Sequence, residues 1–163
     1  MKLRNIKASF IFQNEVMNLK MKKYIWKHSN ITFTIYKHSP KLINVTGIKC
    51  SNELEQQKRI IEEKCNQQVI EVRIDNMFFS KKNHKNLDMS SLYKSMQENE
   101  QYFVNYNIEL FLAMFFHPRN KTYPTILLFR TGSYTLMGGK SFDAIKKSES
   151  FVKMLVQKYL KIK

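Results

Sequence analysis

Two stretches of this chain read alike: residues 31–64 are ITFTIYKHSPKLINVTGIKCSNELEQQKRIIEEK, and residues 123–155 are YPTILLFRTGSYTLMGGKSFDAIKKSESFVKML. Each runs as an apolar strand-like segment, a polar turn and a second strand-like segment. Each then passes through a Gly-x-Lys step, at Gly47 or at Gly138, into an amphipathic helical segment. Because an internal repeat sets the architecture, the duplication predicts a molecule made of two related halves.

A shorter match lies upstream of each copy. Residues 3–6, LRNI, correspond to residues 74–77, IDNM. Alternating apolar side chains predict that these residues belong to strands over 3–12 and 69–79. We therefore place the first repeat at residues 1–66 and the second at residues 67–163.

The other elements follow from periodicity and turn residues. Further strands are expected at 31–36, 42–46, 109–116, 125–130 and 134–137, with turns at 38–41 and 131–133 and a polar connection at 118–124. Helices are expected at 52–65, 83–100 and 142–160, the first opened by a capping box of Asn52 and Glu55. Residues 15–27 fit a short helix or a strand equally. The order β-α-β-β-β-α, twice, predicts an α+β fold with helices on one face of an antiparallel sheet and the other face open.

The charge of the chain is strongly basic, with 28 Lys+Arg against 13 Asp+Glu and a net charge of +15. Residues 1–49 hold ten Lys or Arg and a single acid, Glu15, and no acid occurs between Leu110 and Phe142. The acids gather in the expected helices at 52–64 and 90–100. A polyanionic partner facing the sheet explains this distribution, although a lysine-rich proteome explains the total charge equally well.

Several classes of function find no support in the sequence. Cys50 and Cys65 form no CxxC pair, and the four histidines have no metal-binding spacing. No glycine-rich phosphate loop, membrane span or signal peptide is recognisable. We expect an intracellular, soluble protein that is not an enzyme and has no cofactor or metal.

A longer pattern in the second repeat resembles a known signature. Residues 128–140, LFRTGSYTLMGGK, are similar without a gap to the I-F-x-S-G-K-x-x-x-T-G-A-K signature of the TATA-box-binding protein (TBP) family. In the first repeat, residues 35–36 and 45–49 resemble the same signature with one extra turn residue. Residues 4–6 and 75–77 resemble the Q-N-I/M-V strands that open each repeat of the family, and residues 109–111 resemble its E-L-F. The resemblance covers nearly the whole chain.

This resemblance implies a pseudo-twofold saddle whose concave sheet binds the minor groove of A·T-rich promoter DNA and bends the duplex. It also implies partnership with general transcription initiation factors and RNA polymerase, action as a monomer on DNA, and no catalysis. The location would be the nucleus, or a cytoplasmic viral factory or virion if the protein is viral. The lysine- and asparagine-rich composition fits a large DNA virus or an AT-rich eukaryotic parasite.

The resemblance also assigns residues to the DNA. An aromatic residue in a strand is usually part of the core, so these assignments rest on the signature. The two central asparagines and the first-repeat threonine of the family correspond to Asn5, Asn76 and Thr46. The intercalating phenylalanines of the second repeat correspond to Phe111 and Phe129. The remaining assignments are wedge positions in the first repeat, at Tyr24 and Tyr36, and groove-facing positions at Lys7, Phe78, Leu127 and Met137.

The chain departs from the family pattern at several places. Met137 replaces a threonine, Lys7 a valine and Ser133 a lysine. The step from Asn5 to Gly47 is 42 positions and that from Asn76 to Gly138 is 62, so the first repeat lacks about twenty residues, which we assign to its first helix and following strand. These departures favour an alternative: a TBP-fold scaffold for protein interaction in an initiation or polymerase complex, with little DNA sequence specificity of its own.

Overall fold

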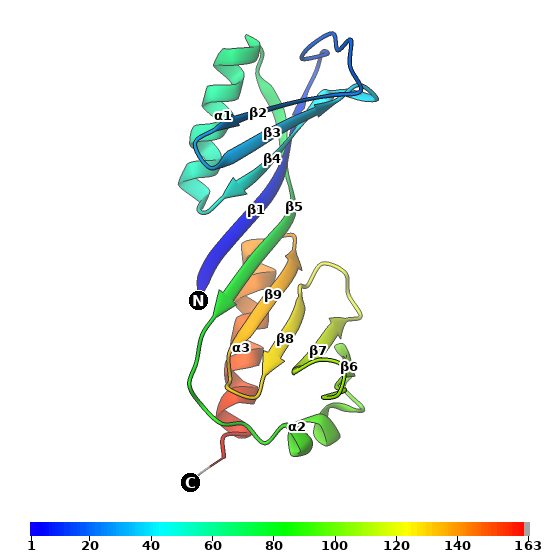
Figure 1. Ribbon diagram of the computed structural model, residues 1–163, viewed down its shortest axis with the longest axis vertical. Coiled ribbons are helices and arrows are strands. Elements are labelled where there is room, and N and C mark those ends of the chain that lie inside the picture. Colours follow the sequence, from blue (N-terminus) through cyan, green and yellow to red (C-terminus); the bar gives the residue numbers. More distant parts are fainter. Residues whose placement is uncertain (162–163) are drawn as a thin grey trace. The chain divides into compact units, whose positions relative to one another are not determined.

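The computed structural model describes residues 1–161 of the chain. They form two compact units: an N-terminal unit, Asn5–Asn76, and a C-terminal unit, Met1–Arg4 with Met77–Lys163. Strand β1 (Lys2–Phe12) begins in the C-terminal unit and continues into the N-terminal unit, whereas β5 (Val69–Lys81) runs the other way. The described residues hold nine strands and three helices, labelled in Figure 1.

The N-terminal unit is an antiparallel sheet with one helix against it. Its strands β2 (Lys23–His28), β3 (Ile31–Tyr36) and β4 (Ser39–Ile48) pair in the order β2-β3-β4-β1, and α1 (Ser51–Cys65) follows. Alternate residues of the strands are fully buried because they face α1, which supplies Leu54 and Ile61. Each fully buried large apolar side chain stabilises the unit by about 1.5–3 kcal/mol. The large strand residues in this core include Ile6, Phe10, Phe12, Phe33, Ile35 and Ile43.

The C-terminal unit has the same plan with two more elements. Its strands pair in the order β5-β9-β8-β7-β6, where β6 is Tyr102–Asn105, β7 Ala113–Pro118, β8 Thr125–Phe129 and β9 Tyr134–Gly139. Helix α2 (Met89–Met96) precedes β6, and α3 (Phe142–Lys158) packs against the sheet with a buried apolar stripe. The fully buried strand residues beneath α3 include Met114, Phe116, Ile126, Leu128, Tyr134 and Leu136.

The two units repeat one detail closely. In each, the pairing of the opening strand slips by one residue, between Ile6 and Lys7 in β1 and between Met77 and Phe78 in β5. The extra residue is a glycine with positive φ, Gly47 at 101° or Gly138 at 83°. A left-handed residue of this kind is typical of a β-bulge and suits glycine, which has no Cβ. The two units thus share a bulge at the same place in the opening strand.

The structure bears out most of the predicted elements and corrects five points. Helix α1 is capped by the Cys50 thiol, which accepts from the Glu53 N–H, so the capping box at Asn52 and Glu55 was wrong. The predicted turn at 38–41 is shorter, because β4 already starts at Ser39. The predicted helix 83–100 is only α2, and 109–112 lie in a turn before β7. Strand β6 was not predicted, because four residues are too few for a clear alternation.

The shortening of the first repeat is confirmed. In the C-terminal unit, α2 and β6 stand between β5 and β7. In the N-terminal unit, β1 leads to β2 through residues 13–22, and no helix or strand lies between them. The missing elements are therefore the first helix and the strand after it. As a result β2 is an edge strand, and its lysines at 23 and 27 suit an unpaired sheet edge.

Candidate nucleic-acid interface

The face of the C-terminal sheet that points away from α3 is largely apolar. Directly paired residues of antiparallel strands lie on the same face of the sheet. The residues that alternate with the buried ones along each strand therefore form two rows across the helix-free face. We call them the inner row and the second row. The inner row is Phe78, Met137 and Thr125, and the second row is Ser80, Thr135, Leu127 and Phe115. Both rows lie on the helix-free side of the sheet.

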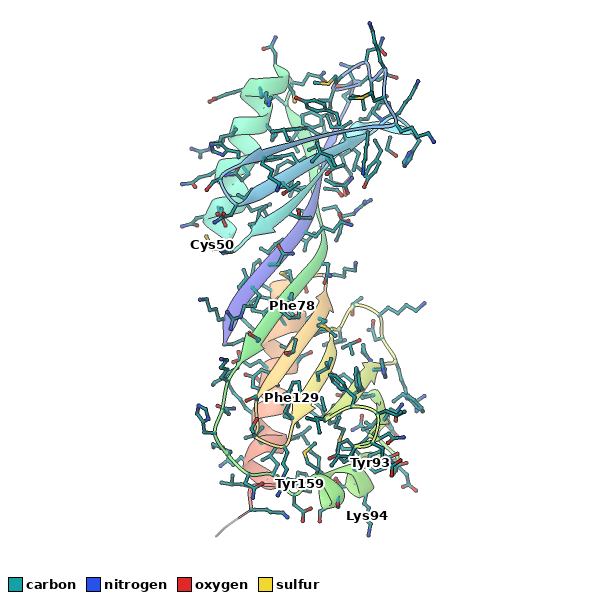
Figure 2. The ribbon with its side chains drawn as sticks, viewed as in Figure 1. Cys50, Phe78, Tyr93, Lys94, Phe129 and Tyr159 are labelled. Atoms are coloured by element: carbon teal, nitrogen blue, oxygen red, sulfur yellow. The ribbon has the colours of Figure 1, made fainter. Side chains whose placement is uncertain are left out.

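Aromatic rings extend this face beyond the two rows. The Phe111 ring centroid lies 5.3 Å from that of Phe115 and 6.3 Å from that of Phe129. The Phe115 ring also stacks on His117, at 5.7 Å between centroids. Phe111 is 46% exposed although it contacts other rings, and Phe129 is half-buried. Figure 2 labels Phe78 and Phe129 on β5 and at the end of β8. The cluster therefore offers flat apolar surface to a ligand.

The same rows in the N-terminal unit carry different chemistry. Here the inner row is Lys7, Thr46, Thr32 and Lys27, and the second row is Ser9, Asn44, Thr34 and Ile25. Hydroxyl, amide and ammonium groups thus occupy the positions that Phe78, Met137 and Leu127 hold in the other unit. Tyr36, which corresponds to Phe129 by strand register, is 37% exposed. One open face is a surface of hydrogen-bond donors, and the other is aromatic.

Tyr24 lies on the opposite side of its sheet from these rows. It pairs with the fully buried Ile35, and its ring lies 5.5 Å from that of Trp26. Trp26 in turn stacks on Phe33 and receives the ammonium group of Lys64 from α1 at 4.6 Å. Tyr24 therefore belongs to the α1 side, and the register places Met21, 65% exposed, where the C-terminal unit has Phe111.

The two asparagines occupy equivalent places, each one residue before the buried Ile6 or Met77. The Asn5 side-chain oxygen accepts from the Gly47 N–H at 2.8 Å. Because that bond occupies the carbonyl side of the amide, the NH₂ group of Asn5 is the part suited to donate to a ligand. Asn76 is exposed at the junction of β5 with the bulge.

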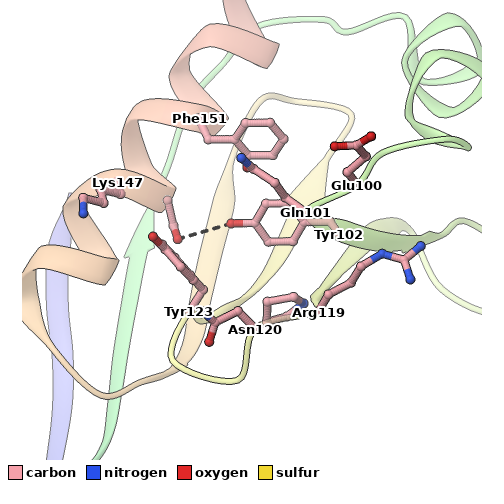
Figure 3. Close-up of a pocket in the computed structure, with 10 residues that line it drawn as sticks. Glu100, Gln101, Tyr102, Arg119, Asn120, Tyr123, Lys147 and Phe151 are labelled. Carbon is pink, nitrogen blue, oxygen red and sulfur yellow. Dashed lines mark hydrogen bonds between the residues drawn. The ribbon is translucent and has the colours of Figure 1, made fainter.

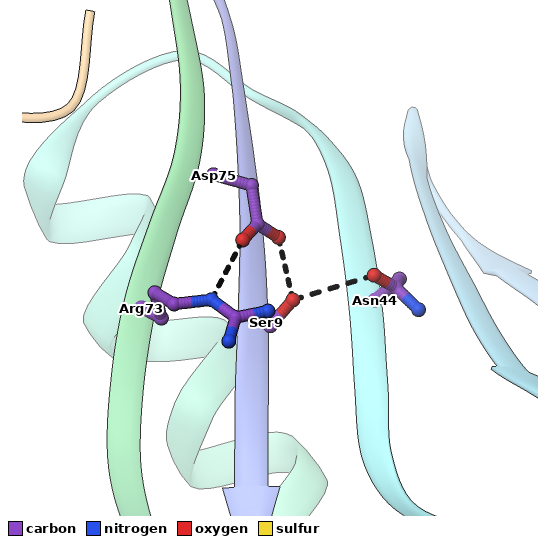
Figure 4. Close-up of polar contacts among 4 residues, drawn as sticks. All are labelled: Ser9, Asn44, Arg73 and Asp75. Atoms are coloured by element: carbon purple, nitrogen blue, oxygen red, sulfur yellow. Dashed lines mark hydrogen bonds and ion pairs between the residues drawn. The ribbon is translucent and has the colours of Figure 1, made fainter. Parts of the chain in front are cut away.

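A polar cluster lies beside the second row of the N-terminal unit, as Figure 4 shows. The fully buried Ser9 hydroxyl donates to the Asp75 carboxylate and lies 3.3 Å from the Asn44 side-chain oxygen. The Arg73 guanidinium pairs with the same carboxylate at 2.9 Å. The arginine offsets the negative charge of Asp75, so the open face stays suited to an anionic partner. In the C-terminal unit the equivalent serine, Ser80, accepts from the Arg4 side chain at 2.7 Å.

A hollow of about 440 Å³ lies between α3, the start of β6 and the residues after β7, shown in Figure 3. Its wall is the stacked pair of Tyr102 and Phe151, with 5.0 Å between ring centroids. Burial raises the pKa of the Tyr102 hydroxyl, which lies 3.4 Å from that of Ser148. The side chains of Arg119 and Lys147 also line it. The hollow lies on the helix side of the sheet, beside α3.

Other kinds of site are not seen in the part of the chain that the structure describes. Within residues 1–161 no three His, Cys, Asp or Glu side chains come together in a way that could hold a metal ion. None of the described helices combines the length and the apolar character needed to cross a membrane. Cys50 and Cys65 are free thiols.

The structure thus places most of the predicted site residues on open sheet faces, but Tyr24 lies on the α1 side and Leu127, although its register is that of the open face, is buried. The sequence analysis missed several residues that the strand register brings to the same faces. The two-residue alternation within each strand could have indicated them, because every second residue faces away from the core once the buried residues are known. The missed residues are Met21, Ile25, Thr32, Thr34, Asn44, Phe103, Phe115 and Thr135.

These observations define a duplicated α+β protein of the TBP-like fold. The structure resembles that of Methanococcus jannaschii TBP with a TM-score of 0.67, at 18% sequence identity, over 96% of this chain and 98% of the other. A family model described as transcription factor TFIID, or TATA-binding protein, matches residues 71–159, which is more than half of the chain. The chain therefore belongs to the TATA-binding protein family, a family of transcription factors. No curated protein sequence gives a significant match.

Proposed function

We propose that this protein binds duplex DNA through the open faces of its sheets, inserts aromatic side chains into the minor groove and bends the duplex at promoters. The observation that carries the proposal is the aromatic cluster of Phe111, Phe115 and Phe129 on a helix-free sheet face. A soluble protein rarely leaves such rings uncovered unless they meet a partner. Family membership makes DNA the first partner to test.

The chemistry of the two faces suits the two demands of the minor groove. At A·T pairs the groove presents only acceptors, so the hydroxyl donors of Thr32, Thr34 and Thr46 can read it. Lys7 adds a cation to this half of the surface. In the other half, Phe78, Leu127 and Met137 supply smooth apolar contact with the groove floor. The N-terminal unit would thus bind DNA mainly through hydrogen bonds, and the C-terminal unit mainly through apolar contacts.

Phe111 and Phe129 would insert their rings as wedges between neighbouring base pairs. Tyr36 would do the same in the first repeat, at the position that corresponds to Phe129. A phenyl ring can replace a base in a stack, and unstacking one base step costs a few kcal/mol that wider contact with bent DNA offsets. Tyr24 is left out of this proposal because its ring faces α1. Asn5 and Asn76 would donate to base acceptors at the centre of the site.

The repeats at residues 1–66 and 67–163 would each bind one half of a pseudo-symmetric DNA site. The protein would act as a monomer, without catalysis, in the compartment where transcription starts, which is the nucleus for a nuclear genome. It would present α1 and α3 to general transcription initiation factors and RNA polymerase.

The proposal is tested by electrophoretic mobility shift with an A·T-rich TATA duplex and a G·C-rich duplex of equal length, from 50 to 200 mM salt. A sequence reader binds the A·T duplex more tightly at every salt concentration. Equal binding of both duplexes that moderate salt abolishes would reject the reader and leave a backbone-charge binder.

A second candidate function is a TBP-fold scaffold that binds protein partners rather than DNA sequence. The hollow beside Tyr102 and Phe151 favours it, because its aromatic wall, with Arg119 and Glu100 also lining it, suits a partner segment with an aromatic residue. The variant Arg119→Gln, at an exposed residue that lines the hollow, separates the two functions. It should leave DNA affinity unchanged and weaken partner capture only if the scaffold function holds.

A further inference from the structure

The segment after β5 runs along the tip of the β8–β9 hairpin and is fastened to it. We call residues 82–87 the basic strap; they hold Lys82, Asn83, His84, Lys85, Asn86 and Leu87. The Lys85 N–H donates to the Thr131 carbonyl at 3.0 Å, and the Leu87 N–H donates to the Arg130 carbonyl at 2.9 Å. These bonds fix the strap as an extended chain rather than the helix predicted for 83–100.

Side chains add further bonds at the same place. The Ser133 hydroxyl donates to the Asn83 carbonyl at 3.1 Å and accepts from the Asn83 N–H at 3.0 Å. The Asn83 amide donates to the Gly132 carbonyl at 2.8 Å, and the Arg130 guanidinium donates to the Asn86 side chain at 3.1 Å. A segment held by this many bonds presents its outward side chains in a defined place, so little ordering cost remains when it binds.

The outward side chains of the strap and hairpin are cationic. Lys82, Lys85 and Arg130 are all exposed. No acid occurs from residue 76 to residue 87 or from 110 to 142, and within residues 1–161 no ion pair involves these three side chains. Within the described residues, their positive charge is therefore not neutralised by an ion pair. Uncompensated cations in a fixed array attract a polyanion.

The strap adjoins the proposed DNA surface within the same unit. An open hollow of about 420 Å³ is lined by Lys82 and His84 from the strap and by Phe129, Ser80 and Thr135 from the open face. The Lys85 side chain lies at the hairpin glycine, with its Cβ 3.4 Å from where a Cβ on Gly132 would stand. Of the strap lysines, Lys82 thus stands beside the proposed wedge Phe129, and Lys85 stands at the hairpin tip.

We infer that the basic strap binds phosphates of the DNA backbone next to the base step at which Phe129 inserts. The inference rests on the proposed function and adds a phosphate site to it. The TBP-family signature has a lysine where this chain has Ser133, and here that serine fastens the strap instead. The charge of the hairpin tip is thus supplied by Lys82, Lys85 and Arg130 rather than by the hairpin turn.

The arrangement favours a polymer of phosphates over a single free phosphate. The three cations follow an extended segment and a hairpin edge, with no group of backbone N–H donors gathered around one point. A free phosphate needs several convergent donors, whereas a DNA strand presents phosphates in succession.

The test measures the salt dependence of A·T-duplex binding for the wild type, Lys82→Gln/Lys85→Gln and a matched control. The control, Lys94→Gln/Lys146→Gln, removes two exposed lysines from α2 and α3 of the same unit. Each lost phosphate contact lowers the slope of log Kobs against log[salt] by about 0.9, so the double strap variant should lose about 1.8. Its deficit in affinity should then be roughly twelve-fold larger at 50 mM than at 200 mM salt. The control slope should equal that of the wild type.

The outcomes separate the strap from the proposed function. If the wild type does not bind DNA, the proposed function fails, and the strap inference fails with it. If the wild type binds and the strap variant keeps the wild-type slope, the strap inference alone is overturned. Competition by 10 mM inorganic phosphate at constant ionic strength, seen only with intact strap lysines, would identify a free-anion site and also overturn it. The variant Lys82→Arg/Lys85→Arg should keep the full slope, and equal thermal midpoints exclude misfolding as the cause.

Discussion

The two bulge glycines make a matched pair for testing how the repeats are built. Gly47 and Gly138 both have positive φ, which costs an alanine about 1–2 kcal/mol. They differ in their surroundings. A Cβ on Gly47 would lie 2.3 Å from the Asn30 carbonyl oxygen, whereas a Cβ on Gly138 would have nothing within 4 Å. Because the obstruction is backbone, relieving it adds about 1–3 kcal/mol, a typical cost of overpacking.

We therefore expect Gly138→Ala to destabilise its unit by about 1–2 kcal/mol and Gly47→Ala by about 2–5 kcal/mol. Hydrogen exchange of peptides from β9 and from β4 measures the opening free energy of each unit separately. Urea unfolding followed by the single Trp26, which lies in the N-terminal unit, gives a second reading for Gly47→Ala. Equal costs at the two glycines would contradict this expectation, because a Cβ meets the Asn30 backbone at Gly47 and meets nothing at Gly138.

Three further changes test other parts of the structure. Ser9→Ala should cost about 1–3 kcal/mol in urea unfolding, because it leaves the Asp75 carboxylate without its buried donor; a cost near zero would contradict the role of this hydroxyl. Cys50→Ser should stabilise α1 by up to about 1 kcal/mol in thermal unfolding, since a hydroxyl caps a helix better than a thiol; destabilisation would show that the thiol is specifically required. Burial works to raise the pKa of Glu149, but hydrogen bonds from Lys153 and Tyr134 outweigh it and keep the pKa below its ordinary value. The Glu149 carboxylate therefore contributes stability above its unfolded pKa, and this contribution is lost as the pH falls through its folded pKa. Glu149→Gln should accordingly flatten the acid side of a plot of unfolding free energy against pH. An unchanged acid side would contradict this role.

Much of the fold could be predicted from the sequence because the same pattern of strands, turn and helix occurs in both repeats. The hairpins and final helices have clear periodicity, and the difference between 42 and 62 positions located the missing elements. The short elements were not readable. Strand β6 has only four residues, and the strap at 82–87 has no periodicity because hydrogen bonds to the hairpin tip, rather than an apolar face, hold it.

The candidate site was readable only in part, for a physical reason. A signature marks single positions, whereas the rows of the open face depend on how strands pair. The register pairs Asn44 with Ser9 and with Thr34, and it pairs Phe115 with Leu127. Only this pairing shows that Thr34, Asn44 and Phe115 belong to the open faces. The family signature assigned Tyr24 to a wedge position, although the alignment with the signature is loose there. The register gives that place to Met21 and turns Tyr24 toward α1.

The central claim is that the open face inserts Phe129 into the minor groove and bends the duplex. Its most direct test is fluorescence energy transfer between dyes at the two ends of a short A·T-rich duplex, measured at saturating protein. The wild type should bring the ends closer, Phe129→Ala should bind with a smaller change, and Phe151→Ala, a half-buried ring on the helix side, should match the wild type. Saturated binding of the wild-type protein with no change in end-to-end transfer would contradict the claim.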